Sequence, residues 1–195
     1  RMVRVGDVAI DAGGQKGWYA MMLARAVGPT GHVLTVEPDP AAADLLQGNL
    51  LRNRAANVTL IREAAGDATQ DVEFHLNAFV GWSSMTPSPL QQAGVMQRTT
   101  VRMRPLDDML ADAAPSAGSR VSFLKIDVEG AEARVLRGAT RILAEHAPLI
   151  WMEINPSSLS AAGSSPAELG DILEPHGYTF WRGRGERRWP RRMRS

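Results

Sequence analysis

Four acidic residues each stand at the end of a short apolar run, where a carboxylate can do chemistry. They are Asp11, Glu37, Asp127 and Glu153. If the apolar runs are strands of a parallel α/β sheet, the acids share one edge, and ligands of such sheets bind outside the carboxyl ends of the strands. A carboxylate there accepts hydrogen bonds from hydroxyl groups, accepts a proton or coordinates a metal ion. The four acids therefore predict a ligand-binding edge.

A glycine-rich turn follows the first of these acids and precedes a helix expected over residues 18–27. Gly13 and Gly17 place this turn in the pattern acid-x-G-x-x-x-G, counted from Asp11. Glycine lets a ligand approach the backbone because it lacks a Cβ atom, and a helix N-terminus points free N–H groups at that ligand. A dinucleotide site has the pattern G-x-G-x-x-G instead. The turn therefore favours a cofactor with a ribose and an amino-acid tail, for which S-adenosylmethionine is the candidate.

The position of Glu37 supports the same type of ligand. It follows Gly17 by about twenty residues, the spacing at which an acid at the end of the second strand meets ribose hydroxyls. A carboxylate accepts hydrogen bonds from both hydroxyls and repels a 2′-phosphate. The alternative is that Glu37 only caps the helix that begins near Pro40.

Strand and helix patterns alternate along the chain, as in βαβ units with a parallel sheet. We expect strands at 8–11, 33–37, 58–61, 72–76, 99–103, 121–127 and 148–154, and helices at 18–27, 40–54, 106–113, 131–145 and 168–176. The alternating segments 72–76 and 99–103 are expected to pair, and residues 178–181 to begin a last strand.

The segment 81–97 is rich in Ser, Pro, Gly and Gln and is expected to be a long loop. Loops of this length in compact domains serve as lids or binding loops or are disordered. Trp82, Ser83 and Ser84 are candidates for a lid over a substrate, and a merely mobile loop is the open alternative.

Composition indicates one globular domain, which we place at residues 1–181. The chain has 195 residues, of which 44% are apolar, and no cysteine, which excludes disulfides, thiolate nucleophiles and cysteine-ligated zinc. No apolar run approaches the length of a membrane span, and no secretory signal is visible. We therefore expect a cytoplasmic protein, and the Arg and Ala bias suggests a bacterial genome.

The net charge of +1 hides an asymmetry between the body of the chain and its end. Residues 182–195 hold seven arginines and one glutamate, which leaves 15 basic and 20 acidic residues before them. We expect this basic tail to be poorly ordered. The alternative is contact with an anionic partner such as RNA, a phosphosugar or a membrane surface.

Several motifs occur in a fixed order along the chain. They are GDVAIDAGGQKG from Gly6, VEPDP from Val36, LIREAAGD from Leu60, GWSSM from Gly81, PLDDML from Pro105 and LKIDVEGAE from Leu124. Together they resemble the FkbM-type S-adenosylmethionine-dependent methyltransferases, and the last run is the most diagnostic. The resemblance covers about residues 6–181. One departure lies in the glycine turn, where Gly14-Gln15 replaces the Ala-Asn that is usual in the family.

The resemblance implies a Rossmann-like class I methyltransferase, an α/β three-layer sandwich with a mostly parallel central sheet. It implies O-methylation of a hydroxyl on a small molecule, such as a natural product, sugar or glycolipid, with S-adenosylhomocysteine as the other product. By position, the cofactor contacts would be Asp11, Gly13, Gly17, Glu37, Gly66 and Asp67. Glu37 would bind the ribose hydroxyls, and Asp67 would reach the adenine amino group.

An alcohol is a poor nucleophile, so a base or a metal ion is expected to help remove its proton. Asp127, Glu129 and Glu153 are the candidates for base or metal ligand, although a divalent metal is not indicated by the sequence. The alternative for Glu129 is a residue that only caps or solvates its helix.

Two other functions stay open at this point. One is a nucleic-acid methyltransferase that uses the basic tail, which the acidic body makes less favourable. The other is a relative that binds S-adenosylmethionine without catalysis.

Overall fold

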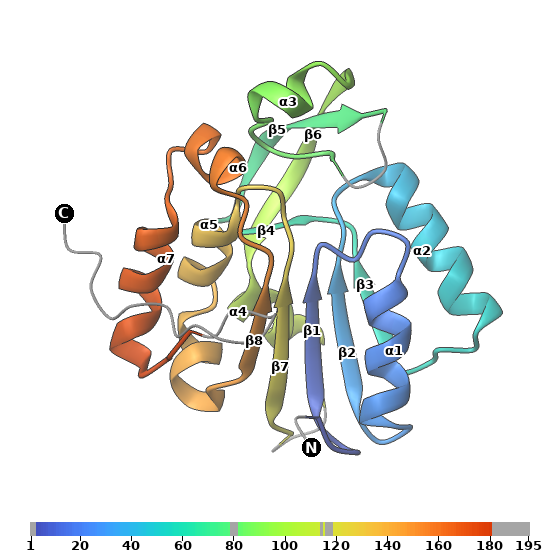
Figure 1. The fold of residues 1–195 in the computed structure, drawn as a ribbon. Coiled ribbons are helices and arrows are strands. Elements are labelled where there is room, and N and C mark those ends of the chain that lie inside the picture. The colour runs from blue at the N-terminus through green and yellow to red at the C-terminus, as the bar shows by residue number, and fades with distance from the viewer. Residues whose placement is uncertain (1–2, 79–81, 114, 116–118, 181–195) are drawn as a thin grey trace.

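The central sheet consists of five parallel strands in the order β3-β2-β1-β7-β8 (Figure 1). The computed structural model describes residues 3–78, 82–113, 115 and 119–180. The strands span Val58–Ile61 (β3), His32–Val36 (β2), Val8–Ala12 (β1), Val121–Ile126 (β7) and Leu149–Met152 (β8). The parallel sheet expected from the alternating pattern is confirmed.

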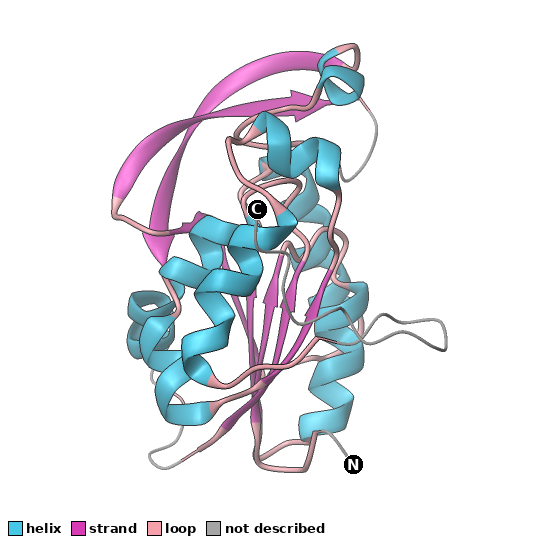
Figure 2. Cartoon of the chain, turned by 60° about the vertical axis from the view of Figure 1, so that its left-hand side comes forward, coloured by secondary structure: helices cyan, strands magenta, loops and turns pink. Residues whose placement is uncertain are grey.

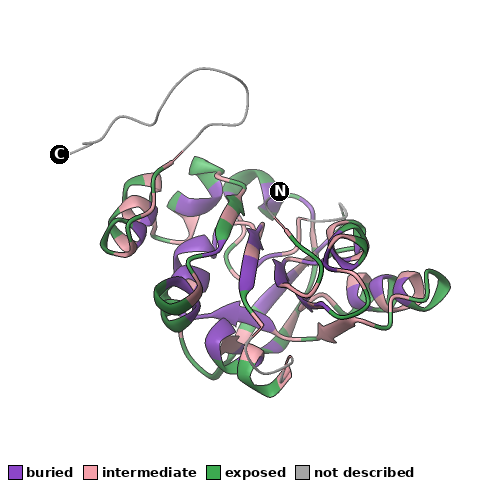
Figure 3. Ribbon diagram, turned by 90° about the horizontal axis from the view of Figure 1, so that it is seen from below, coloured by how far each residue is buried: buried purple, intermediate pink, exposed green. Residues whose placement is uncertain are grey.

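Helices cover both faces of this sheet (Figure 2). Successive side chains of a strand point to opposite faces, so β1 contributes to two separate clusters. Ile10 packs in the cluster that contains residues of α4, α5 and α7, whereas Ala9 packs with residues of α1. The helices span Trp18–Val27 (α1), Pro40–Arg52 (α2), Leu106–Ala113 (α4), Glu132–Arg137 (α5) and Pro166–Leu173 (α7). Figure 3 shows the central strands as the buried layer between these helices.

The order of the strands places a crevice at the carboxyl ends of β1 and β7. The chain adds β2 and β3 on one side of β1, and β7 and β8 on the other, and ligands bind where the order reverses in this way. Asp11 lies in β1, while Glu37, Asp127 and Glu153 directly follow β2, β7 and β8. The predicted position of the four acids on one edge is confirmed.

A second, three-stranded sheet stands above the carboxyl ends of the central strands (Figure 1). Its order is β4-β6-β5, and it spans Ala64–Gly66 (β4), Gln70–Asn77 (β5) and Val95–Pro105 (β6). The predicted pairing of 72–76 with 99–103 is confirmed, because β5 and β6 are antiparallel with Val72 opposite Val101.

The segment 81–97 is not one long loop, which corrects that prediction. A short helix, Pro89–Gln92 (α3), interrupts it, and β6 occupies its last residues. Ser88 Oγ accepts the Gln91 N–H while Gln91 Oε1 accepts the Ser88 N–H, which is a capping box. Proline at the first helical position also favours this start. Local capping therefore outweighed the loop-like composition.

The single helix expected over residues 131–145 is wrong, because two helical segments replace it. The second is a π-helix, Ile142–His146. Gly138 lies between them, and a Cβ atom there would be 1.8 Å from the carbonyl oxygen of Gly66. The carboxylate of Asp107 then accepts backbone N–H groups at the start of the second segment. Apolar residues keep their helical spacing on both sides of Gly138, so the periodicity of the sequence did not indicate the interruption.

The last described part of the chain also departs from prediction. The helix expected over 168–176 begins two residues earlier, as α7, and ends in a 3₁₀ turn at Glu174–His176. Residues 178–180 form no strand, so the expected last strand is wrong there. A short helix, Pro156–Ala161 (α6), was not predicted. Trp181 and the basic tail lie outside the described residues.

Candidate functional site

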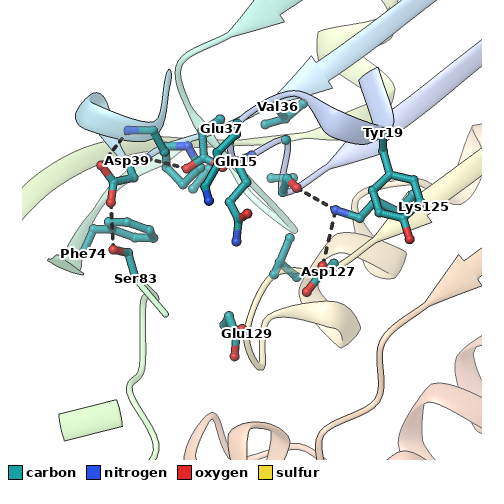
Figure 4. A pocket seen from close by; sticks show the side chains of 18 of the residues that line it. Gln15, Tyr19, Val36, Glu37, Asp39, Phe74, Ser83, Lys125, Asp127 and Glu129 are labelled. Atoms are coloured by element: carbon teal, nitrogen blue, oxygen red, sulfur yellow. Dashed lines mark hydrogen bonds and ion pairs between the residues drawn. The ribbon is translucent and has the colours of Figure 1, made fainter. Parts of the chain in front are cut away.

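A cavity of about 320 Å³ opens at the carboxyl edge of the central sheet (Figure 4). The turn after β1, the end of β2, β4, β5 and the loop after β7 all contribute to its walls. Four of the predicted site residues line it, namely Gly13, Glu37, Asp127 and Glu129. The structure therefore brings the glycine turn and the acids that follow two strands, β2 and β7, into one cavity.

The glycine turn is shaped by close contacts that exclude larger residues. Gly13 has φ +86°, and a Cβ atom on it would lie 1.9 Å from the carbonyl oxygen of Asp127. A Cβ atom on Gly14 would lie 2.3 Å from Thr35 Oγ1, which explains why alanine does not occur there in this chain. Gly17, with φ +85°, precedes the first residue of α1. The turn therefore presents bare backbone to the cavity.

Glu37 is buried and bound to the same turn. Its Oε2 accepts the Gln15 N–H at 2.7 Å and its Oε1 accepts the Asp39 N–H at 2.8 Å. Gln15 has φ +50°, a left-handed conformation that directs its N–H toward Glu37. Burial raises the pKa of Glu37 to about 7. Each carboxylate oxygen still has a lone pair for a ligand hydroxyl.

Lys125 connects the strand that carries Asp127 to the glycine turn. It is 3% exposed, and its Nζ donates to the Gly13 carbonyl oxygen at 2.6 Å. The same Nζ lies 3.2 Å from Asp11 Oδ1 and 3.5 Å from Asp127 Oδ2, and 5.1 Å from the centre of the Tyr19 ring. Burial raises the pKa of Asp11, and the ammonium of Lys125 opposes that rise. Lys125 therefore holds the turn and two of the acids together.

Glu129 occupies a strained and acidic position beside the cavity. Its backbone has φ +53°, and its Oε2 accepts the Gln91 side-chain N–H at 2.7 Å. Burial, followed by the nearby carboxylates of Asp127, Glu153 and Glu132, raises its pKa to about 7. A group with such a pKa exchanges a proton near neutral pH, as a general acid or base requires.

The ionised carboxylate of Glu129 is expected to destabilise the fold at high pH. The pKa of Glu129 is raised from 4.5 to about 7, so wild-type stability falls as pH rises through that window. Glu129→Gln removes the charge and keeps an acceptor for Gln91. We expect equal stability near pH 4.5 and a gain of about 1 kcal/mol above pH 8, after discounting for solvent screening.

Urea unfolding at both pH values measures this difference. Glu145→Gln is the matched control, because Glu145 is an exposed glutamate outside the site. The control should show the same difference from wild type at both pH values. A Glu129→Gln variant that is no more stable than wild type at pH 8 would contradict the electrostatic account.

The segment that was a candidate lid is bound to the rim of the cavity. Ser83 Oγ donates to Asp39 Oδ2 at 2.7 Å and accepts the Asn77 N–H at 3.0 Å. Ser84 pairs with His75 of β5 through two backbone hydrogen bonds. Ser83 and Met85 thus form part of the cavity wall.

The other predicted site residues lie around the cavity and do not line it. Asp11 is fully buried beneath the turn. Gly66 packs against Met103 and Gly138. Asp67 pairs with Arg134 Nε at 3.2 Å, and its proposed contact with adenine stays a prediction.

Glu153 also lies behind the cavity. It interacts with Asp127, and burial together with that neighbour raises its pKa. Its expected role as base or metal ligand stays a prediction. Among the residues that the structure describes, no group of three or more acidic, histidine or cysteine side chains forms a metal site.

A second cavity of about 240 Å³ adjoins the first. Met85 and Glu129 line both cavities, so the Glu129 carboxyl stands at the boundary between them. Arg134 and Arg137 of α5 line the second cavity.

Sequence reasoning missed several functional positions. Lys125, Gln15 and Tyr19 line the cavity, and Gln91 binds Glu129. Of these positions, only Lys125 could have been noticed in the sequence, because a lysine is unusual within a buried strand.

The sequence of residues 11–180 matches the family model described as the methyltransferase FkbM domain. Methyltransferase sdnD of Sordaria araneosa is 27% identical over 202 residues, which covers 91% of this chain and 75% of sdnD. A protein-L-isoaspartate O-methyltransferase of Methanothrix thermoacetophila is 39% identical over 67 residues, which covers 34% of this chain and 30% of that protein.

The fold also matches a solved structure. The crystal structure of methyltransferase FkbM from Methylobacillus flagellatus gives a TM-score of 0.56 at 23% identity. The match covers 86% of this chain and 37% of that one, so this chain spans well under half of its structural relative. The expected class I α/β sandwich is confirmed. In the described segments, no helix has the length and apolar character needed to cross a bilayer.

Proposed function

This chain belongs to the FkbM methyltransferase family, and from that premise we propose that it is an S-adenosylmethionine-dependent O-methyltransferase of small-molecule hydroxyls. The observation that carries the proposal is the arrangement of one cavity. A glycine turn with bare backbone and a buried acid form one part of it, and a carboxyl with a pKa of about 7 lies at its boundary with a second cavity.

The residues of the first cavity fit the cofactor. Glu37 would accept the ribose hydroxyls, as the free lone pairs on its oxygens allow. Gly13 and Gly14 both line the cavity, and only glycine fits at these positions because a Cβ atom would collide with Asp127 or Thr35. When bound, the cofactor supplies an electrophilic methyl group on a sulfonium.

The chain's own residues then have to position an acceptor and take its proton. Glu129 Oε2 is held by Gln91, which leaves Oε1 to accept the proton of a hydroxyl in the second cavity. Alignment of the reacting atoms lowers such a barrier by about 7–11 kcal/mol, and a base adds to this by increasing the electron density on oxygen. The local similarity to an O-methyltransferase supports oxygen as the acceptor atom.

Binding of S-adenosylhomocysteine tests the cofactor half of this proposal. Calorimetry with the folded chain should give saturable binding at a ratio of one. Gly13→Ala should abolish binding, since its Cβ would lie 1.9 Å from the Asp127 carbonyl oxygen. Gly163→Ala is the matched control, because it also has positive φ but its Cβ meets no atom within 4 Å.

The identity of the methyl acceptor is tested with methyl-labelled S-adenosylmethionine and a panel of hydroxylated small molecules, with RNA as the competing substrate. Mass spectrometry should place the label on a small-molecule oxygen, and Glu129→Gln should lower the rate. Absence of S-adenosylhomocysteine binding by the folded wild type would refute the proposal, and transfer to RNA alone would replace its acceptor half.

A further inference from the structure

Two arginines line the second cavity, and we propose that they bind an anionic group of the acceptor, a carboxylate or a phosphate. The inference rests on the proposed function, because it assigns the second cavity to the acceptor. Arg134 and Arg137 are three residues apart on α5 and therefore lie on the same face of the helix. A guanidinium presents a planar fork of donors that matches the oxygens of carboxylates and phosphates.

Both guanidiniums are positioned by acidic partners. Arg134 Nε lies 3.2 Å from Asp67 Oδ1, and Arg137 Nη2 pairs with Glu168 Oε1. Both arginine side chains remain 39% and 45% exposed, respectively. Each guanidinium has five N–H donors, and these contacts use only one nitrogen of each. The remaining donors are available to a ligand.

The acids beside these arginines are already paired with them. Glu168 accepts a hydrogen bond from Ser164 at 2.6 Å through Oε2, in addition to its pair with Arg137 through Oε1. Asp67 does not line the cavity. The unused N–H donors of the two guanidiniums therefore favour a ligand that brings oxygen acceptors to this end of the cavity.

Small residues leave space in front of the arginines. The lining includes Gly130, Ala131, Ala133, Ala162 and Gly163. A Cβ atom on Gly163 would meet no atom within 4 Å. The cavity of about 240 Å³ is therefore open enough at this end for a compact anionic group.

The opposite end of the cavity fixes the orientation of the acceptor. Glu129 belongs to both cavities, and Asp127, Glu132 and Glu153 are near it. These carboxylates repel an anion but accept a hydrogen bond from a hydroxyl. An acceptor with both groups would bind with its anion at the arginines and its hydroxyl at Glu129.

Calorimetry on the protein saturated with S-adenosylhomocysteine tests this inference. The probes are glucose 6-phosphate, glucuronate and glucose, so that phosphate and carboxylate are separate arms and the neutral sugar is the reference. We expect at least one anionic probe to bind at least tenfold more tightly than glucose. Arg134→Gln or Arg137→Gln should weaken that binding about tenfold or more, since hydrogen bonds to charged groups are among the strong ones.

Two further variants make the test specific. Arg102→Gln is the matched control, because Arg102 is an exposed arginine of β6 that pairs with Asp71 of β5, and it should not change the affinity for the probes. Glu168→Gln should tighten binding of the anionic probe several-fold, because it removes the carboxylate that competes for Arg137.

Anionic probes that bind no more tightly than glucose, or binding that both arginine substitutions leave unchanged, would overturn the inference. Affinity for S-adenosylhomocysteine should stay constant in Arg137→Gln, Glu168→Gln and Arg102→Gln. Failure of the wild type to bind S-adenosylhomocysteine is a separate result, which counts against the proposed function itself.

Discussion

Lys125→Met is expected to lower the free energy of unfolding by about 3–5 kcal/mol, the usual cost of removing one partner of a buried ion pair. Asp11 is fully buried and lies 3.2 Å from the Lys125 ammonium. Methionine fills a similar volume but leaves that carboxylate without a counter-charge. The Gly13 carbonyl oxygen also loses its donor, so the glycine turn should loosen as well.

Urea unfolding at pH 7 measures this cost, and the chain offers a matched control. Lys16, its only other lysine, is exposed, and Lys16→Met should change stability by no more than about 0.5 kcal/mol. The double variant Asp11→Asn/Lys125→Met should recover part of the loss, because it leaves no buried charge unpaired. Wild-type stability in Lys125→Met would mean that the pair contributes nothing to the fold.

This lysine also marks where sequence reasoning succeeded and where it failed. The apolar runs were sufficient to predict the five central strands and their parallel orientation. The acids at the ends of four of them predicted the edge on which Asp11, Glu37, Asp127 and Glu153 gather. Those features depend on local pattern and on a general rule of parallel sheets. Lys125 lies in the most diagnostic motif, yet apart from Asp127 its charged and hydrogen-bonded partners are in another strand and in the glycine turn. Nothing local indicates such a contact.

The same reason explains the errors in the fold. Gly138 ends α5 because it packs against Gly66, and Asp107 starts the next helical segment from a distant helix. The pairing of Asp67 with Arg134 likewise joins distant residues and was not predicted, while the contact of Asp67 with adenine stays a prediction. Periodicity reports the face that a segment buries, and it contains no information about which distant group interrupts that segment.

Gln91 is a third case, in which composition was misleading. It lies in a segment rich in Ser and Pro, where a loop was the reasonable expectation. The capping box that forms α3 was readable from Ser88 and Gln91. Its consequence was not, because the hydrogen bond to Glu129 joins residues 38 positions apart. The site could therefore be located from the sequence, but the residues that bind its carboxylates could not be identified.

Glu37→Ala is expected to weaken S-adenosylhomocysteine binding about 100-fold. The carboxylate would accept hydrogen bonds from two ribose hydroxyls, each hydrogen bond to a charged group contributes about 1.5–3 kcal/mol, and 1.4 kcal/mol corresponds to tenfold. Asp44→Ala is the matched control, because Asp44 is an exposed acid on α2 that pairs only with Arg62 among the described residues. Calorimetry should give wild-type affinity for the control.

The pH dependence of binding separates a direct contact from a structural effect. Burial raises the pKa of Glu37 to about 7, and protonation removes an acceptor, so wild-type affinity should fall as pH drops from 8 to 6. Glu37→Gln keeps one acceptor oxygen and cannot titrate, and we expect it to bind with intermediate affinity that is constant over this range. If Glu37 only supported the turn through Gln15 and Asp39, its substitution would weaken binding, but the affinity of Glu37→Gln would still depend on pH as in the wild type. If affinity changed equally with pH in wild type and Glu37→Gln, Glu37 would not contact the ribose. The weaker binding of Glu37→Ala would then result from a change in the conformation of the turn.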